Sequence, residues 1–150
     1  MGRSIIGRFN VVPQLLLRMQ SGKAVRLRDF AAQQKLGRTS FDVKLQDDGL
    51  VHPIPPSTTE FVRPNGMSLR PPGGNFQETL ETFQKPPIIF RLVEGTPLPA
   101  HFTLLHEHTD HFSLQTTEPV SITELNKRMT VFLSQFQIIT TQDYIREFGL

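Results

Sequence analysis

Proline and glycine interrupt the middle of this chain so often that a helix bundle is excluded. The 150 residues include twelve prolines and ten glycines, and most of the prolines lie between His52 and Pro99. Proline lacks a backbone N–H and breaks both helix interiors and central strands, so this region consists of short elements joined by loops. The length suits one domain with its own hydrophobic core. We therefore expect a single α+β domain over residues 1–150.

Hydrophobic periodicity predicts strands and helices in alternation along the chain. Alternating apolar residues predict strands over 4–12, 67–69, 88–93 and 104–115, where the last range includes a polar turn, and a hairpin over 41–54. Apolar residues three and four apart predict helices over 13–20, 26–36 and from an N-cap at Asn75 to Phe83. Ser121 and Glu124 have the spacing of a capping box, which predicts a further helix. An amphipathic turn around Tyr144 ends the domain.

Composition limits the compartment and the partners. The chain has no cysteine, so disulfides and thiolate metal sites are excluded. No apolar stretch has the length of a membrane span, and the N-terminus lacks the apolar core of a signal peptide, so we expect a cytoplasmic protein. The formal net charge is only +2. Basic residues between positions 3 and 28 are typical of a solvated face, and they also suit an anionic ligand.

The sequence LLHEHTDHFSLQ, residues 104–115, concentrates the titratable groups. Its H-x-H-x-D-H run matches the metal-ligand run of metallo-β-lactamase-like hydrolases, with His106, His108, Asp110 and His111 as the ligands. Such a fold needs further histidine ligands downstream, and no histidine follows His111. The alternative is a polar hairpin tip, in which these groups pair with one another.

Two other interpretations of the polar residues stay open. A Ser-His-Asp triad can be written from Ser68, His111 and Asp110, although no G-x-S-x-G elbow surrounds the serine. The chain could also be a non-catalytic binding module that keeps a fold and recognises a protein.

Four motifs together resemble one family. They are PNGMSLRP at 64–71, EGTPLP at 94–99, LLHEHTDHFSLQ at 104–115 and the ITELNKRMTVFL helix. They resemble fungal relatives of a small type VI secretion cytotoxin whose fold is similar to ADP-ribosyltransferases and whose toxicity depends on NAD. The resemblance implies a mixed, split β-sandwich with flanking helices and an NAD cleft between two small sheets.

The resemblance also implies the site residues. Arg8 matches a first-strand arginine that contacts the phosphate or ribose of NAD. Ser68 matches a hydroxyl residue that supports the nicotinamide ribose, and Asn65 and Gly66 would let the backbone approach the ligand. His111 matches a histidine at the entrance to a later strand, where it and Gln115 would contact ribose hydroxyls or the acceptor.

Two departures from the family pattern concern the chemistry. Met67 stands where the bacterial toxin has a threonine next to its serine. Gln115 stands where a transferase carboxylate would stabilise the oxocarbenium-like ribosyl cation, with Glu107 and Glu118 as the nearest substitutes. The family implies action in the cytosol of a target cell on an unknown macromolecular acceptor, with either transfer or hydrolysis of NAD, and it implies a neutralising immunity or antitoxin protein.

Overall fold

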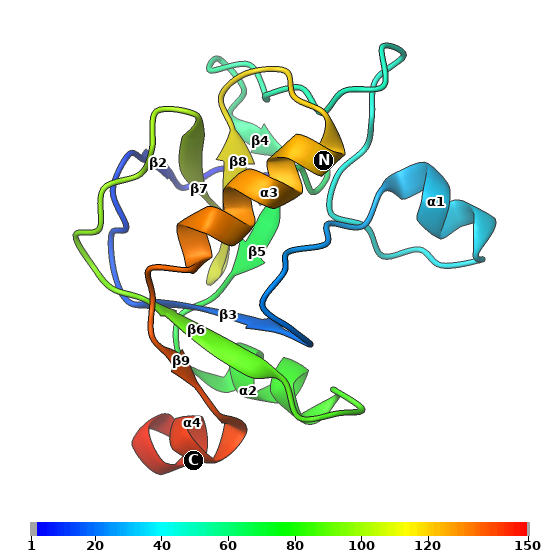
Figure 1. The fold of residues 1–150 in the computed structure, drawn as a ribbon. Coiled ribbons are helices and arrows are strands. Elements are labelled where there is room, and N and C mark those ends of the chain that lie inside the picture. Colours follow the sequence, from blue (N-terminus) through cyan, green and yellow to red (C-terminus); the bar gives the residue numbers. More distant parts are fainter. Residues whose placement is uncertain (1–2, 150) are drawn as a thin grey trace.

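The computed structural model describes residues 3–149 (Figure 1). Within them the strands are β1 (Arg3–Ser4), β2 (Gly7–Phe9), β3 (Leu16–Gln20), β4 (Glu60–Phe61), β5 (Met67–Leu69), β6 (Ile88–Leu92), β7 (Phe102–His108), β8 (His111–Thr116) and β9 (Ile138–Ile139). The helices are α1 (Phe30–Lys35), α2 (Gly74–Glu81), α3 (Ile122–Leu133) and α4 (Thr141–Phe148). The expected α+β class is confirmed.

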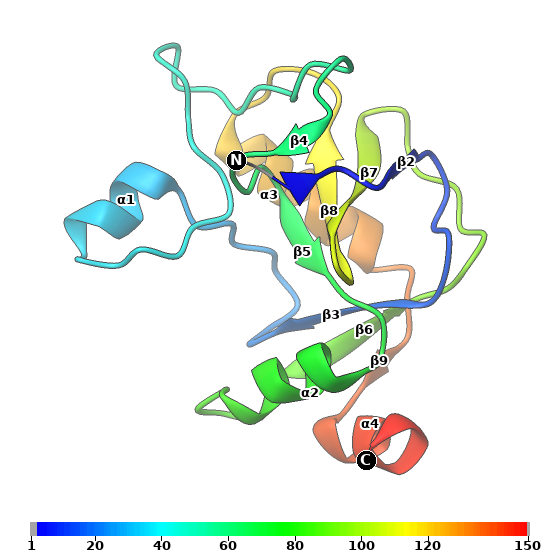
Figure 2. The same cartoon turned by 180° about the vertical axis from the view of Figure 1, so that it is seen from behind.

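The strands form two principal sheets and a small accessory pair. The larger sheet has the order β2-β7-β8-β5, the second has the order β3-β6-β9, and β1 pairs with β4. Each paired strand runs antiparallel to its partner. Helix α3 lies across one face of the larger sheet, whereas α2 and α4 lie beside the second sheet (Figure 1). Seen from behind, β5 descends from the larger sheet toward β3 and α2 (Figure 2).

A short backbone contact joins the two principal sheets. Leu17 on β3 donates its N–H to the carbonyl of Arg70, 2.7 Å away, and Arg70 donates back to the Leu17 carbonyl over 3.2 Å. Arg70 directly follows β5, so this antiparallel bridge fixes β3 against the edge of the larger sheet. The two sheets of the split arrangement that the resemblance implies are therefore joined by one backbone bridge, which we call the seam, between β3 and the end of β5.

The buried apolar residues form two hydrophobic clusters, and β3 and β6 contribute side chains to both. The larger cluster includes Leu104, Leu114, Leu125, Met129 and Phe132, which lie between the larger sheet and α3. The predicted cap of this helix is confirmed, because the Ser121 side chain accepts a hydrogen bond from the N–H of Glu124.

The smaller cluster packs α2 and α4 against β3 and β6. It contains Leu17, Phe76, Leu80, Ile89 and Tyr144, all nearly inaccessible to solvent. The expected apolar stripe of α2 is thus buried at Phe76 and Leu80, whereas Phe83 beyond the helix end is exposed. The expected terminal amphipathic element is α4.

The helix predicted over 13–20 is wrong, because this segment contains strand β3. Its residues pair in unbroken register with β6, from Leu16 opposite Leu92 to Gln20 opposite Ile88. Three consecutive leucines favour a helix locally, but the apolar strand β6 needs a partner, and tertiary pairing overrides propensity.

The hairpin predicted over 41–54 is also wrong. Its turn exists, since Gln46 donates to the Leu50 carbonyl and Gly49 has a φ of 79°. The two arms do not pair with each other, because Val43 bridges to Asp29 and Val51 bridges to Val120. Each arm is held by a different part of the core.

Two helix starts differ from their predicted positions. The helix expected over 26–36 begins only at Phe30, because Asp29 is the N-cap and accepts a hydrogen bond from the N–H of Ala32. The N-cap of α2 is Gly73 rather than Asn75, whose side chain donates to Asp110 instead. None of the helices formed by residues 3–149 combines the length and apolar character that a membrane crossing requires.

Replacing Gly66 should destabilise the fold. A Cβ at this position would lie 2.1 Å from the backbone carbonyl oxygen of Leu114, which β8 cannot move without breaking its pairing with β5. Gly66→Ala is expected to lower the free energy of unfolding by about 1–3 kcal/mol. Gly22→Ala is the matched control, because its Cβ would meet no atom within 4 Å. Equal urea midpoints for the two variants would contradict this close approach.

Candidate functional site

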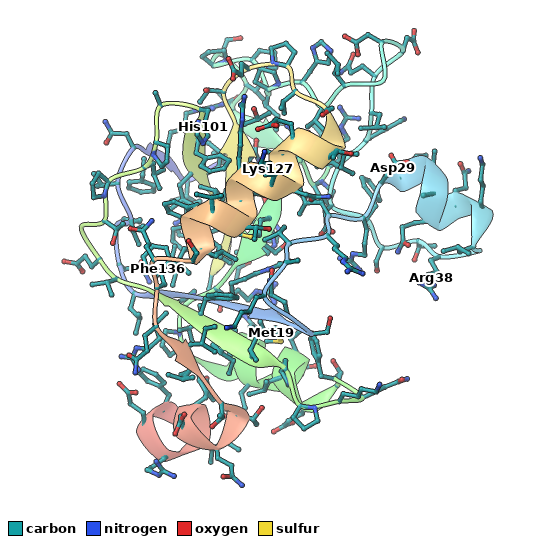
Figure 3. All side chains as sticks on the ribbon, viewed as in Figure 1. Met19, Asp29, Arg38, His101, Lys127 and Phe136 are labelled. Carbon is teal, nitrogen blue, oxygen red and sulfur yellow. The ribbon has the colours of Figure 1, made fainter. Side chains whose placement is uncertain are left out.

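A large cleft opens where the two principal sheets meet. Its volume is about 990 Å³, which lies at the upper end of the range of about 300–1,000 Å³ for ligand pockets. Its walls come from β3 and the segment that follows, from the end of β5, from α2 and from the tip of the β7–β8 hairpin. Met19, which Figure 3 labels on β3, contributes an apolar surface to it together with Phe76 and Phe83.

The cleft is strongly cationic. Five basic side chains line it, and they are Arg18, Lys23, Arg26, Arg28 and Arg70. The single acidic side chain among the lining residues is Asp42. This imbalance favours an anionic ligand, because low-dielectric walls concentrate the field of the cations.

Asp42 is neutralised by Arg28. The guanidinium donates from Nε to Oδ2 and from a terminal nitrogen to Oδ1, both over 3.1 Å. The backbone N–H of Arg28 also donates to Oδ2 over 2.7 Å. The hydrogen bonds to this carboxylate raise the pKa of Arg28. Asp42 is therefore committed to a bidentate pair with Arg28. Arg70 lies 3.5 Å from Asp110, which is outside the lining of the cleft, so a ligand anion would share Arg70 with that carboxylate.

Arg18 is the most desolvated cation of the cleft. Its Nε donates to the Gln20 side-chain oxygen over 3.0 Å, and a terminal nitrogen donates to the Ser68 carbonyl over 3.2 Å. Burial lowers the pKa of Arg18 to about 10, and the attraction of Asp42 only partly offsets the burial and the nearby charge of Arg28. A cation held this far from water gains more than an exposed one from an anionic partner.

Ser68 and His111 meet at the wall of the cleft. The Ser68 hydroxyl oxygen lies 3.0 Å from Nε2 of His111, and both residues line the cavity. Behind the imidazole, Oε1 of Glu107 lies 2.9 Å from Nδ1. That approach is too bent for a linear hydrogen bond, and among residues 3–149 neither atom has a better partner. Glu107 is 1% exposed, so the three groups run from the core to the cleft.

The other residues predicted near Ser68 lie beneath the cleft. The Gln115 amide nitrogen donates to Oε2 of Glu107 and to the Ser113 hydroxyl, each over 3.2 Å, and its side chain is buried. Asn65 is buried too and donates to the His52 carbonyl. Gly66 faces the Leu114 carbonyl, so its backbone approaches strand β8. None of these predicted residues lines the cleft.

Arg8 lies in a different part of the molecule. It is on β2, opposite Leu105 in the larger sheet, with β7 and β8 between it and β5. Its guanidinium donates to the carbonyl oxygens of Thr58 over 3.0 Å and Pro55 over 3.4 Å. The structure thus brings Ser68 and His111 together and leaves Arg8 outside the lining of their cleft.

The histidine run does not assemble a metal centre. Among residues 3–149 no group of three or more histidine, cysteine, aspartate or glutamate side chains could hold a metal ion. His106 stacks on Phe112, and the His108 ring stacks on that of His111. Asp110 binds Asn75 and lies 3.5 Å from Arg70. The polar-tip alternative describes these contacts better. His101, labelled in Figure 3, lies instead at the start of β7 beside Phe102.

Sequence reasoning missed Arg18 as a member of the site, and it named Glu107 only as a substitute for the carboxylate absent at Gln115, not as the group behind His111. Arg18 was assigned to a helix, although the basic character of the N-terminal segment pointed to an anionic ligand. Four cations of that segment line the cleft, and they are Arg18, Lys23, Arg26 and Arg28. Glu107 precedes His111 by four residues across a hairpin turn. The predicted triad would have placed Asp110 behind the imidazole, where the structure has Glu107.

Comparison with known proteins identifies one family. The model of the Tse2 ADP-ribosyltransferase toxin family matches residues 14–145, a range that includes the whole cleft and excludes Arg8. Comparison with curated proteins and with solved structures finds no match. The α+β fold with its antiparallel sheets agrees with this family.

Arg18 should destabilise the ligand-free protein. The lowering of its pKa to about 10 by burial corresponds to a cost of roughly 3 kcal/mol. The cost is fully present at neutral pH, where Arg18 is protonated in both the folded and the unfolded state. It shrinks above about pH 10, because the folded protein then loses this proton while the unfolded chain still holds it. Arg18→Met should raise the free energy of unfolding by about 1–2 kcal/mol, since the lost hydrogen bonds offset part of the gain.

The matched control is Arg146→Met, because the side chain of Arg146 is 76% exposed. Its effect should stay within about 0.5 kcal/mol. Urea unfolding of both variants at neutral pH measures the difference, and an Arg18→Met protein less stable than wild type would contradict the prediction.

Proposed function

Because the chain belongs to the Tse2 ADP-ribosyltransferase toxin family, we propose that it is a toxin that uses NAD as co-substrate. The observation that carries the proposal is the Ser68–His111 pair in the wall of a cationic cleft. NAD joins two nucleosides through a pyrophosphate, so it needs cations beside polar groups for ribose and apolar surface for its rings. This cleft offers all three.

We assign the parts of NAD to the parts of the cleft by their chemistry. The pyrophosphate suits Arg18 and Arg70, since guanidinium groups bind phosphate oxygens in a bidentate manner. The nicotinamide ribose suits Ser68 and His111, whose oxygen and nitrogen atoms exchange hydrogen bonds with hydroxyl groups. Phe83, which is partly exposed, and Met19 supply apolar surface for a base.

Gln115, Asn65 and Gly66 enter this proposal as supports. Gln115 holds the Glu107 carboxylate behind His111. Gly66 permits the close pairing that presents Ser68. A contact of Arg8 with NAD stays a prediction from the family resemblance, and the present proposal does not use it, because the guanidinium donates to the carbonyls of Pro55 and Thr58 and lies outside the lining of the cleft.

The wider setting follows from the family. We propose that the chain acts in the cytosol of a target cell on a macromolecular acceptor, and that a dedicated immunity or antitoxin protein neutralises it. Secretion by a type VI system and a fungal source stay predictions. The metal-dependent hydrolase has no support, since residues 3–149 hold no ligand cluster for an ion.

NAD should bind through Arg18. Isothermal calorimetry on Arg18→Met should show binding roughly 10–100-fold weaker than wild type, because a charged hydrogen bond to the pyrophosphate is lost. Arg8→Met is the parallel variant, and it should bind NAD as wild type does. The reverse ranking would move the site to the β2 edge. Wild-type protein that neither binds NAD nor gains thermal stability from it would support the non-catalytic binding module.

Toxicity should depend on Ser68. Ser68→Ala removes the hydroxyl that faces the nicotinamide ribose and should lower nicotinamide release about tenfold or more, with a loss of growth arrest when the chain is expressed in the cytosol of a host. Ser134→Ala, an exposed serine at the end of α3, controls for expression and handling. Undiminished lethality of Ser68→Ala at equal protein level would remove Ser68 from the site.

A further inference from the structure

Three neighbouring strands bring a carboxylate, an imidazole and a hydroxyl into one row. Glu107 comes from β7, His111 from β8 and Ser68 from β5, and these strands are adjacent in the larger sheet. The contacts are 2.9 Å from Oε1 to Nδ1 and 3.0 Å from Nε2 to the hydroxyl oxygen. The order is that of the acid, base and nucleophile of acyl-transfer enzymes. Here it ends in a cationic cleft.

The position of the buried carboxylate favours one tautomer of the imidazole. A carboxylate accepts hydrogen bonds and donates none, so a small rotation of either side chain that straightens the 2.9 Å approach would pair Oε1 of Glu107 with a proton on Nδ1 of His111. Gln115 donates its amide N–H to the other oxygen of Glu107 and holds the carboxylate in place. In that tautomer Nε2 of His111 is the acceptor and the Ser68 hydroxyl, 3.0 Å away, is the donor. The row therefore prepares His111 to take a proton from Ser68.

No other pair in the cleft can activate a hydroxyl in this way. His111 is the one imidazole among the described residues that line the cavity, and its Nε2 already faces Ser68. The one lining carboxylate, that of Asp42, is committed to Arg28. Glu118, the other candidate carboxylate, pairs with Arg128 and does not line the cleft. The hydroxyl best placed to lose its proton is thus part of the protein itself.

We propose that Ser68 is a nucleophile and accepts ADP-ribose from NAD, so that the protein modifies itself; this inference rests on the proposed function. A bond forms between the Ser68 oxygen and C1′ of the nicotinamide ribose as the glycosidic C1′–N bond breaks. Nicotinamide leaves as a neutral molecule with the bonding electrons. The hydroxyl proton passes to Nε2 of His111, and Glu107 stabilises the resulting imidazolium.

The product would limit the toxin. A glycosidic bond between ribose C1′ and a serine oxygen is stable in water, so the adduct accumulates. ADP-ribose attached to Ser68 would also occupy the cleft and block a second NAD. Each chain then performs one turnover on itself unless an outside acceptor reaches the ribose first.

Mass spectrometry of the whole chain incubated with NAD tests the proposal. Wild type should gain one ADP-ribosyl group per chain, and peptide fragmentation should place it on Ser68. Ser68→Ala should gain none, whereas the control Ser134→Ala should be modified at the wild-type rate. Glu107→Gln keeps the shape of the side chain but loses the charge, and it should slow the modification roughly 10²–10⁴-fold.

A second measurement separates a positioning role of Glu107 from a merely structural one. Nitrogen NMR of His111 should show the proton on Nδ1 in wild type and a shift of the tautomer toward Nε2 in Glu107→Gln, with circular dichroism unchanged. An unchanged tautomer and an unchanged rate in this variant would overturn the relay. If Glu107→Gln does not fold, the comparison of wild type with Ser68→Ala decides whether Ser68 is the nucleophile.

Different experimental results would overturn the modification of Ser68 and the use of NAD as co-substrate. Nicotinamide release without an adduct, or an adduct that maps to another residue or persists in Ser68→Ala, would overturn the nucleophile and leave the transferase intact. Absence of NAD binding by calorimetry would overturn both. An adduct on Ser68 that is lost in Ser68→Ala and slowed in Glu107→Gln is the expected result.

Discussion

The seam between β3 and β5 is the constraint on which the site depends. Two backbone hydrogen bonds between Leu17 and Arg70 hold the three-stranded sheet against the edge of the four-stranded sheet. This places Arg18 beside the Ser68 carbonyl, to which it donates a hydrogen bond. Because these hydrogen bonds use only backbone atoms, the side chains of Arg18 and Arg70 can still line the cleft. The cleft lies beside this seam, between β3 and the end of β5.

Charge distribution divides the site into a binding half and a reacting half. The half that we propose to bind NAD is cationic, and within it burial lowers the pKa of Arg18. The reacting half is a neutral serine and an imidazole backed by a buried carboxylate. This chain has Gln115 where the transferase pattern has a carboxylate, and a different carboxylate, that of Glu107, lies behind His111. In our proposal the chemistry of the cleft therefore depends on the row of Glu107, His111 and Ser68 rather than on a carboxylate that faces the substrate.

The sequence predicted the local features and missed those that depend on distant contacts. Short apolar segments between turn residues correctly identified β5, β6 and the β7–β8 hairpin, because this signal lies within each strand. Buried residues alternate strictly in β5, whereas β6 and β8 bury successive residues. The helix expected around Arg18 is absent because this segment pairs with β6 instead. No local signal in the sequence reveals a pairing partner about 70 residues away. Ser68 and His111 were selected from motifs, yet their contact and the carboxylate behind them required the order of three strands. Arg8 was also selected from the resemblance, and the order of the strands places it on β2, outside the lining of the cleft.

A crystal structure of Ser68→Ala with NAD bound tests the central claim most directly, because this variant cannot form the proposed bond to the ribose. We expect the nicotinamide ribose beside position 68 and His111, and the pyrophosphate against the guanidinium groups of Arg18 and Arg70. Density for NAD on the β2 side near Arg8, with the cleft between β3 and β5 containing only solvent, would contradict the account.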